Sequence, residues 1–172
     1  MTLEIIKNND ITLAPFINLQ QLYEHEFATI TGYKTGDNGL YSQKEIMSHW
    51  HEKFDVYILY QDKRPIGFSV INLKSMINSN VNTRDMAEFF IVPDSRKHGL
   101  GKWFAQEIFK KYPGKWQVRQ FPGLKAREFW TKVISEFTQG YFKDTEMKNE
   151  LWEGSLQEFE TPKLKEINTM GC

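Results

Sequence analysis

Cysteine is almost missing from the sequence: among 172 residues the only one is Cys172, the last. A single thiol excludes an intrachain disulfide framework and a metal site built from several thiolates, and it argues against a cysteine nucleophile. The Gly-x-Ser-x-Gly elbow of serine hydrolases is also missing. His49 and His51 stand two positions apart on an expected helix, where side chains do not face one another, so no metal site is predicted.

An excess of charge of one sign is missing as well. Lys and Arg number 22, Asp and Glu also number 22, and the formal net charge is +0. Domains that bind nucleic acids usually carry a basic excess, which displaces counterions from phosphates. The balance therefore argues against a nucleic-acid partner and favours a small anionic ligand at a local basic patch.

Long hydrophobic runs are missing too. No apolar stretch approaches the length of about 18 residues that a membrane span needs, and the first residues do not resemble a signal peptide. We therefore expect no membrane association and a cytoplasmic location. Aromatic residues, in contrast, are plentiful: 13 Phe, 7 Tyr and 5 Trp make 15% of the chain, which excludes disorder as the main state.

The spacing of apolar residues predicts alternating helices and strands. Steps of three and four residues predict helices at 12–32, 42–51, 99–111 and 126–137. Strands are expected at 3–7, 54–60, 65–73, 86–92, 116–121, 141–147 and 151–159, with a long polar loop at 74–85. The strand at 86–92 is apolar apart from Glu88 and is expected in the middle of the sheet.

The order of these elements predicts the α/β class, with a mixed, mostly antiparallel sheet and helices on both faces. No repeat and no internal linker interrupts the chain. We therefore expect one domain over residues 1–160, followed by a polar tail at 161–172.

The residues that indicate chemistry lie between the strand at 86–92 and the helix that follows it. Val92-Pro93 ends the strand, and the polar loop leads to Arg96-Lys97-His98-Gly99-Leu100-Gly101-Lys102. The first N–H groups of a helix have no internal partner and carry partial positive charge, so they attract anions. Glycines let a phosphate approach the backbone closely. A diphosphate is the expected ligand, and a solvated helix start is the alternative interpretation of the basic cluster.

Two nucleotide-binding motifs do not fit this loop. A dinucleotide fingerprint needs a third glycine, where this chain has Phe104. A phosphate-binding Walker loop needs Ser or Thr directly after Gly-Lys, where this chain has Trp103.

The segment resembles the GNAT superfamily of N-acetyltransferases, whose signature is Gln/Arg-x-x-Gly-x-Gly/Ala after a strand that ends in Val-Pro. Residues 96–101 fit this signature at every specified position. A second signature, Asn-x-x-Ala-x-x-aromatic-Tyr, fits at Ala126 and Phe129, whereas Gly123 replaces Asn and Trp130 replaces Tyr. The replacements suggest a distinct subgroup of that superfamily.

The resemblance implies acetyl-coenzyme A as cosubstrate and an amine as acceptor. The loop, above all the backbone from His98 to Lys102, would hold the diphosphate, with Arg96 and Lys97 beside it. The strand backbone at Phe90, Ile91 and Val92 would pair with the pantetheine arm, in a splay between this strand and the one at 116–121. Residues of the following helix would line its other side, namely Gly123, Ala126, Phe129 and Trp130.

Two carboxylates are candidates for the base that removes a proton from the amine. Glu88 is the lone acid in an apolar strand, where burial raises a carboxyl pKa, although a structural salt bridge would also explain it. Glu26 borders the apolar stripe of the first helix, and a solvent-facing acid is the alternative there. Trp130 does not ionise, so it cannot serve as the acid, and a thiolate can leave without one.

Three functions are therefore compared. The first is an N-acetyltransferase with an unidentified amine acceptor. The second is a module that binds the coenzyme but has reduced catalysis, because the usual Asn and Tyr are missing. The third is an interaction domain whose glycines only start a helix. A homodimer through exposed aromatic side chains remains open.

Overall fold

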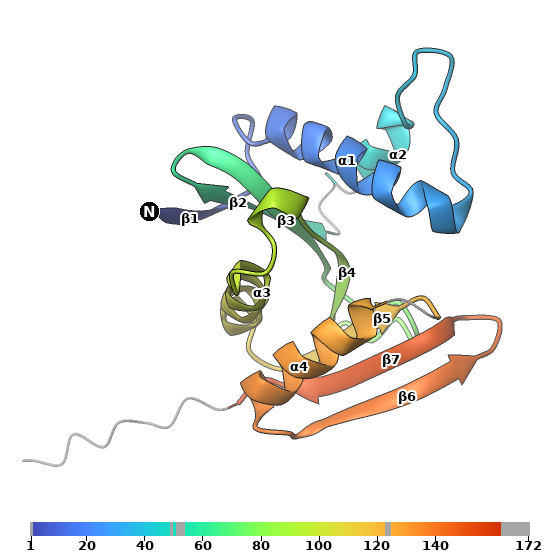
Figure 1. Cartoon of the computed structure of the whole chain (residues 1–172). Coiled ribbons are helices and arrows are strands. Elements are labelled where there is room, and N and C mark those ends of the chain that lie inside the picture. The colour runs from blue at the N-terminus through green and yellow to red at the C-terminus, as the bar shows by residue number, and fades with distance from the viewer. Residues whose placement is uncertain (1, 49, 51–53, 123–124, 163–172) are drawn as a thin grey trace, which may run out of the picture.

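The computed structural model describes residues 2–48, 50, 54–122 and 125–162 (Figure 1). Its strands and helices follow in the order β1 (Leu3–Lys7), α1 (Leu13–Thr31), α2 (Gln43–Ser48), β2 (Phe54–Gln61), β3 (Arg64–Asn72), β4 (Thr83–Ile91), the 3-10 turn η1 (Pro93–Ser95), α3 (Leu100–Lys111), β5 (Lys115–Gln120), α4 (Ala126–Thr138), β6 (Phe142–Lys148) and β7 (Glu153–Glu160). Every predicted element is present. The helix expected at 42–51 is described as far as Ser48, because 49 and 51–53 lie outside the described residues.

The strands form one sheet in the order β1-β2-β3-β4-β5-β7-β6. Neighbouring strands are antiparallel except β4 and β5, which are parallel. Helices α1 and α2 lie on one face of the sheet, and α3 and α4 lie on the other (Figure 1). The predicted α/β class with a mostly antiparallel sheet is therefore confirmed, with β4 in the middle.

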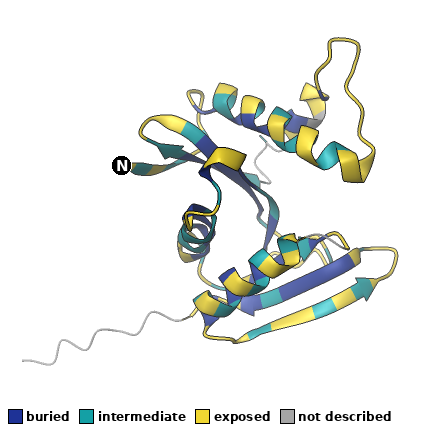
Figure 2. Ribbon diagram, in the orientation of Figure 1, coloured by how far each residue is buried: buried dark blue, intermediate teal, exposed yellow. Residues whose placement is uncertain are grey.

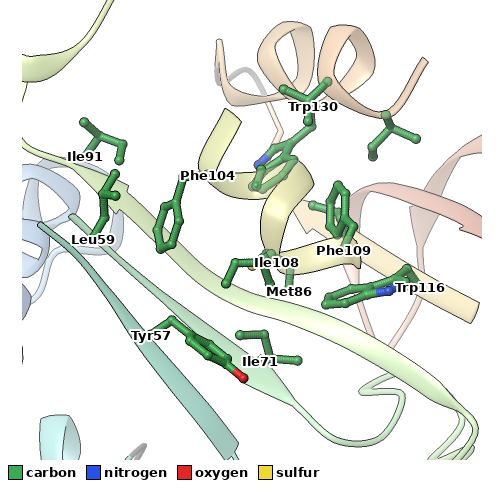
Figure 3. Close-up of a cluster of buried hydrophobic side chains, with 14 of the residues drawn as sticks. Tyr57, Leu59, Ile71, Met86, Ile91, Phe104, Ile108, Phe109, Trp116 and Trp130 are labelled. Atoms are coloured by element: carbon green, nitrogen blue, oxygen red, sulfur yellow. The ribbon is translucent and has the colours of Figure 1, made fainter. Parts of the chain in front are cut away.

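Two hydrophobic cores cover the two faces of the sheet. Buried residues lie along the central strands and on one stripe of the helices (Figure 2). The α3–α4 core is rich in aromatic rings from both helices and from the strands beneath them (Figure 3); its largest members include Phe104, Phe109, Trp116 and Trp130. The α1–α2 core is smaller and contains Phe16, Leu19, Ile46, Val56, Ile58, Phe68, Val70 and Phe90. Each helix buries one stripe of apolar side chains, as its period of three to four residues requires.

Strand β4 begins at Thr83, three residues before the start that its apolar pattern indicates. The extra residues include Arg84 and Asp85, which are charged and so do not look like strand residues in a hydropathy pattern. Arg84 donates to the carbonyls of Leu73 and Val81, and Asp85 is paired with Arg119 of β5. Asp85 thus has a cationic partner and Arg84 has two carbonyl acceptors, although Arg84 Nε has no hydrogen-bond partner among the described residues. With these partners β4 includes both residues, and the predicted loop at 74–85 is correspondingly shorter.

Among the described residues, no helix is both long and apolar enough to cross a membrane. The described part of the chain also has no group of three or more His, Cys, Asp or Glu residues placed to hold a metal ion. After β7, the Thr161 hydroxyl accepts a hydrogen bond from the backbone N–H of Gly114. Residues 163–172 of the predicted tail lie outside the described residues.

Candidate functional site

Strands β4 and β5 separate at the middle of the sheet. Their parallel pairing covers Thr83 to Met86 on β4 and Lys115 to Val118 on β5, and it ends there, although both strands continue. Beyond this point β4 keeps its pairing with β3 on one side only. The predicted splay between these two strands is thus present, and it leaves one edge of the second half of β4 without a strand beside it.

A β-bulge lies where the two strands separate. Glu88 is opposite Val70 and Met86 is opposite Ile71, so Ala87 is an extra residue in β4. Side chains of a strand alternate between its faces, and an inserted residue reverses that alternation. Met86 accordingly faces the α3–α4 core, whereas Ala87 contacts the α1–α2 core and Glu88 reaches α1.

A cavity of about 260 Å³ occupies the splay. Its wall comes from α1, β4, β5, α4 and the segments that follow β5 and precede β7, and its described lining residues are Tyr23, Phe27, Met86, Ala87, Glu88, Phe89, Val118, Arg119, Gln120, Phe121, Ala126, Trp130 and Trp152. Residues from α1 and from α4 line the same space. Because these two helices lie on opposite faces of the sheet, the cavity is lined from both faces.

Glu88 is the carboxylate of this cavity. Burial raises the pKa of its carboxyl from 4.5 to about 7, and a hydrogen bond donated by Gln20 Nε2 lowers it in part. The Gln20 nitrogen lies 2.5 Å from Glu88 Oε2, and the whole Gln20 side chain is buried in α1. Near neutral pH this carboxyl therefore exists in both the protonated and the ionised form, which suits a group that exchanges protons.

The first turn of α3 has backbone N–H groups without a partner in the helix. The first hydrogen bond of the helix runs from the Trp103 N–H to the Gly99 carbonyl over 3.0 Å, so the N–H groups of Leu100, Gly101 and Lys102 have no carbonyl partner within the helix. Gly99 has φ +77° and open space beside it. Lys97 also has a left-handed backbone, with φ 71°, which is uncommon for a residue other than glycine.

The four basic residues near the loop before α3 differ in what their side chains contact. Arg96 makes two hydrogen bonds to Glu26 of α1, 2.9 Å and 2.7 Å long, and donates through Nε to the carbonyl of Ile91. Lys102 is paired with Glu136 of α4 at 2.8 Å. Lys97 and His98 are exposed. The side chains of Arg96 and Lys102 are thus held by carboxylates of neighbouring helices.

Helix α4 brings the second predicted signature to the same place. Ala126 and Trp130 line the cavity, and Trp130 is also buried in the α3–α4 core. Phe129 covers Gly101, where an added Cβ would lie 3.4 Å from the phenyl ring. Leu100, Phe90 and Ile91 are buried, and Val92 is partly exposed. Gly123, also expected here, lies outside the described residues.

Several residues of the cavity carry no sequence signal that singles them out. Tyr23 and Phe27 come from α1, Arg119 comes from β5, and Trp152 comes from the turn before β7. Gln20 of α1 does not line the cavity but donates to its carboxylate, Glu88. Tyr23 and Phe27 do belong to the apolar stripe predicted for the first helix. The stripe packs into the core at Phe16 and Leu19 and then continues as the cavity wall.

No known protein family matches the sequence, and no curated protein does. Solved structures of acetyltransferases match its fold. The ribosomal-protein-S18-alanine N-acetyltransferase of Escherichia coli is 10% identical with a TM-score of 0.62, over 96% of this chain and 98% of that one. The GNAT-superfamily phosphinothricin acetyltransferase of Sinorhizobium meliloti, in complex with acetyl-CoA, is 11% identical with a TM-score of 0.64, over 94% and 89%.

The PaiA N-acetyltransferase of Thermoplasma acidophilum, in complex with coenzyme A, is 16% identical with a TM-score of 0.56, over 93% of this chain and 99% of that one. At such low identities, the likeness shows the fold alone. This chain therefore has the fold of GNAT acetyltransferases.

Proposed function

We propose that the chain is an acetyl-CoA-dependent N-acetyltransferase of the GNAT superfamily. One observation carries the proposal: the cavity at the splay of β4 and β5 is lined from both faces of the sheet and contains a carboxyl with a pKa of about 7. Two of the neighbours in fold are complexes with coenzyme A or acetyl-CoA. The cavity offers a place where a thioester from one face and an amine from the other would meet.

The residues present fit a bound diphosphate at the start of α3. A side chain at Gly99 would occupy the open space that a phosphate needs, and a side chain at Gly101 would press against Phe129. We assign the anion to the backbone from His98 to Lys102, with the exposed Lys97 and His98 side chains beside it. Arg96 and Lys102 would contribute through the backbone, because their side chains already form ion pairs.

The pantetheine arm is assigned to the open edge of β4. The backbone of Phe90, Ile91 and Val92 lies past the end of the β5 pairing. Arg96 Nε already donates to the Ile91 carbonyl over 2.7 Å, and the Val92 N–H donates to the Ile66 carbonyl over 2.8 Å, so the arm would pair with the backbone groups of this segment that are not engaged in these two bonds. Ala126, Phe129 and Trp130 of α4 would contact its other side, and Gly123 precedes them in the sequence.

Glu88 is assigned as the general base. Acetyl-CoA supplies an acetyl thioester, so a nitrogen–carbon bond forms while the carbon–sulfur bond breaks and the sulfur takes the bonding electrons. Primary amines arrive as ammonium ions, because their pKa lies near 10, and a proton must leave before the nitrogen can attack. The ionised form of Glu88 accepts that proton inside the cavity.

Glu26, the second carboxylate predicted as a candidate for the base, is assigned a different role. Its two oxygens accept hydrogen bonds from Arg96, which ties α1 to the loop before α3. We assign Glu26 as a positioning residue that holds Arg96, because both of its oxygens are engaged by that guanidinium.

Titration calorimetry with acetyl-CoA tests the coenzyme site, using Gly99→Asp and Gly99→Asn as a matched pair. Both residues tolerate a left-handed backbone and start helices well, and they differ by one negative charge. We expect the Asp variant to bind at least about tenfold more weakly than the Asn variant. Equal affinities would remove the diphosphate from this loop.

A second candidate function is a coenzyme-binding module with reduced catalysis. Trp130 favours it, because this side chain lies in the cavity where the superfamily signature has a tyrosine that can donate a proton. Amine-dependent release of coenzyme A thiol, followed with a chromogenic thiol reagent, separates the two. Binding without release by any amine would favour the module.

A further inference from the structure

The part of the cavity that faces α1 is built from aromatic rings. Tyr23 and Phe27 lie one turn apart on α1 with ring centroids 4.5 Å apart. Phe121 and Trp152, from the segments after β5 and before β7, form a second pair with centroids 5.1 Å apart. Phe121 is 42% exposed, and Phe27 and Trp152 are partly exposed, so these rings have apolar surface that the protein core does not cover.

The positive charge in the wall of this cavity is already paired within the protein. Arg119 is the one cationic side chain among the described lining residues. Its guanidinium donates twice to the buried Asp85, over 2.9 Å and 3.0 Å, and lies 4.6 Å from the Trp152 ring centroid. The positive charge is therefore already neutralised and covered. A ligand carboxylate or phosphate would find no uncompensated cation among these residues, and burying it would be unfavourable.

Glu88 supplies the negative charge on the α1 side of the cavity. Tyr23 and Phe27 lie one and two turns beyond Gln20, which holds this carboxylate, on the same helix. An ammonium group directed at Glu88 would thus carry its substituent past aromatic faces, which attract both apolar groups and cations. The cavity of about 260 Å³ also has to admit the acetyl end of the coenzyme, so the substituent has to be small.

We propose that the acceptor is a small primary amine with a flat apolar body and no anionic group, of the arylalkylamine class. The inference rests on the proposed acetyl transfer and adds what the transfer acts on. The ammonium group gives one proton to Glu88, and the neutral nitrogen then bonds to the acetyl carbon while the carbon–sulfur bond breaks. The second proton lost by the nitrogen is taken up by the departing sulfur, so the coenzyme leaves as its thiol. The products are an N-acetyl arylalkylamine and coenzyme A.

Rates of thiol release with four amines test the proposal. The probes are 2-phenylethylamine, propylamine, phenylalanine and putrescine, which in turn keep the ring, remove it, add a carboxylate or replace the ring by a second cation. We expect kcat/KM for 2-phenylethylamine to exceed each of the others by at least about tenfold. A higher or equal value for propylamine, phenylalanine or putrescine would overturn the assignment.

Two variants locate the effect in the aromatic wall. Phe27→Ala should raise the KM for 2-phenylethylamine about tenfold or more and leave that for propylamine nearly unchanged. Ile30→Ala is the matched control, because Ile30 lies on the same helix, is 49% exposed and does not line the cavity. Equal changes for both amines in Phe27→Ala would contradict the proposed ring contact.

Calorimetry with acetyl-CoA on the same samples separates this inference from the function on which it rests. If the protein binds acetyl-CoA and acetylates propylamine or putrescine best, the acceptor class is wrong and the acetyltransferase stands. If it binds acetyl-CoA and acetylates none of the four amines, the acceptor class is again wrong. If it does not bind acetyl-CoA, both proposals fail.

Discussion

At the scale of single residues, the activity should depend on whether position 88 carries a carboxylate. Glu88→Gln keeps the size of the side chain but cannot accept a proton, so kcat/KM should fall by about 10²-fold or more. The acidic limb of the pH–rate profile, expected near pH 7 in the natural protein, should vanish with it. Glu128→Gln, an exposed acid on α4, serves as control and should leave both unchanged. An unaltered limb in Glu88→Gln would reject Glu88 as the base.

Gln20 should set the pKa of the Glu88 carboxyl. Its Nε2 donates to Glu88 and lowers the carboxyl pKa, so Gln20→Leu should raise the pKa and move the acidic limb to higher pH. Gln21→Leu is the matched control: Gln21 bonds to the backbone of Tyr41, and its loss should affect stability without moving the limb. The test is kcat/KM of both variants, measured between pH 5 and pH 9. A merely structural Gln20 would give two variants with the same pH profile.

Glu88 should also make the stability of the protein depend on pH. Its pKa is 4.5 when unfolded and about 7 when folded, so between these values the folded state binds the extra proton. Stability therefore falls as pH rises through this range. Glu88→Gln should remove about 1–3 kcal/mol of the loss between pH 5 and pH 8, allowing for the partial exposure of the group. Urea unfolding at pH 5 and pH 8 measures the free energy of unfolding of both proteins. Equal losses in the natural protein and in Glu88→Gln would contradict this prediction.

At the scale of elements, β3 and β4 approach one another closely at Gly67. A Cβ there would lie 2.5 Å from the Phe90 carbonyl oxygen and 2.6 Å from Ile91 Cδ1. Gly67→Ala should therefore lower the free energy of unfolding by about 1–3 kcal/mol and weaken acetyl-CoA binding, because the backbone of β4 must shift. Ser69→Ala on the same strand is the control. Its buried hydroxyl has no hydrogen-bond partner among the described residues, so its loss should be neutral or stabilising.

The bounds of a helix or strand were predictable from the sequence where one stripe or one face is apolar, as in α4. They were less predictable where polar side chains have partners inside the protein. The charged start of β4 is such a case, because Asp85 is paired across strands and no hydropathy pattern shows that pairing. The loop before α3 was predictable from Gly99 and Gly101. The left-handed backbone of Lys97 and the ion pair of Arg96 with Glu26 were not predictable, because they depend on tertiary contacts.

At the scale of the whole molecule, the sheet is held together at its centre by a short parallel pairing and a buried ion pair. Asp85 of β4 is fully buried and accepts two hydrogen bonds from Arg119 of β5. Asp85→Ala would leave Arg119 without its partner, so we expect a loss of about 3–5 kcal/mol in the free energy of unfolding. Glu136→Ala, which breaks the exposed pair with Lys102, should lower the free energy of unfolding far less, because solvent screens that pair. Equal losses in the two variants would contradict this difference.

The molecular architecture was predictable from the order of elements. The coenzyme half of the site could be proposed from one loop and one helix of the sequence, and it stays a prediction. The proposed acceptor half could not, because its rings come from α1, the end of β5 and the turn before β7, far apart in the sequence. Phe121 and Trp152 stand in no motif, and only the folded sheet brings them to Tyr23 and Phe27.

The extra residue at Ala87 means that the length of β4, as much as its composition, decides where its side chains point. Removing this one residue would move each side chain of β4 from position 88 onward to the opposite face of the sheet. The acid would move into the α3–α4 core, and Phe89 would trade sides with it, although every residue discussed for catalysis would still be present in the sequence. A shortened chain of this kind would keep every motif and would have lost the proton acceptor that we propose.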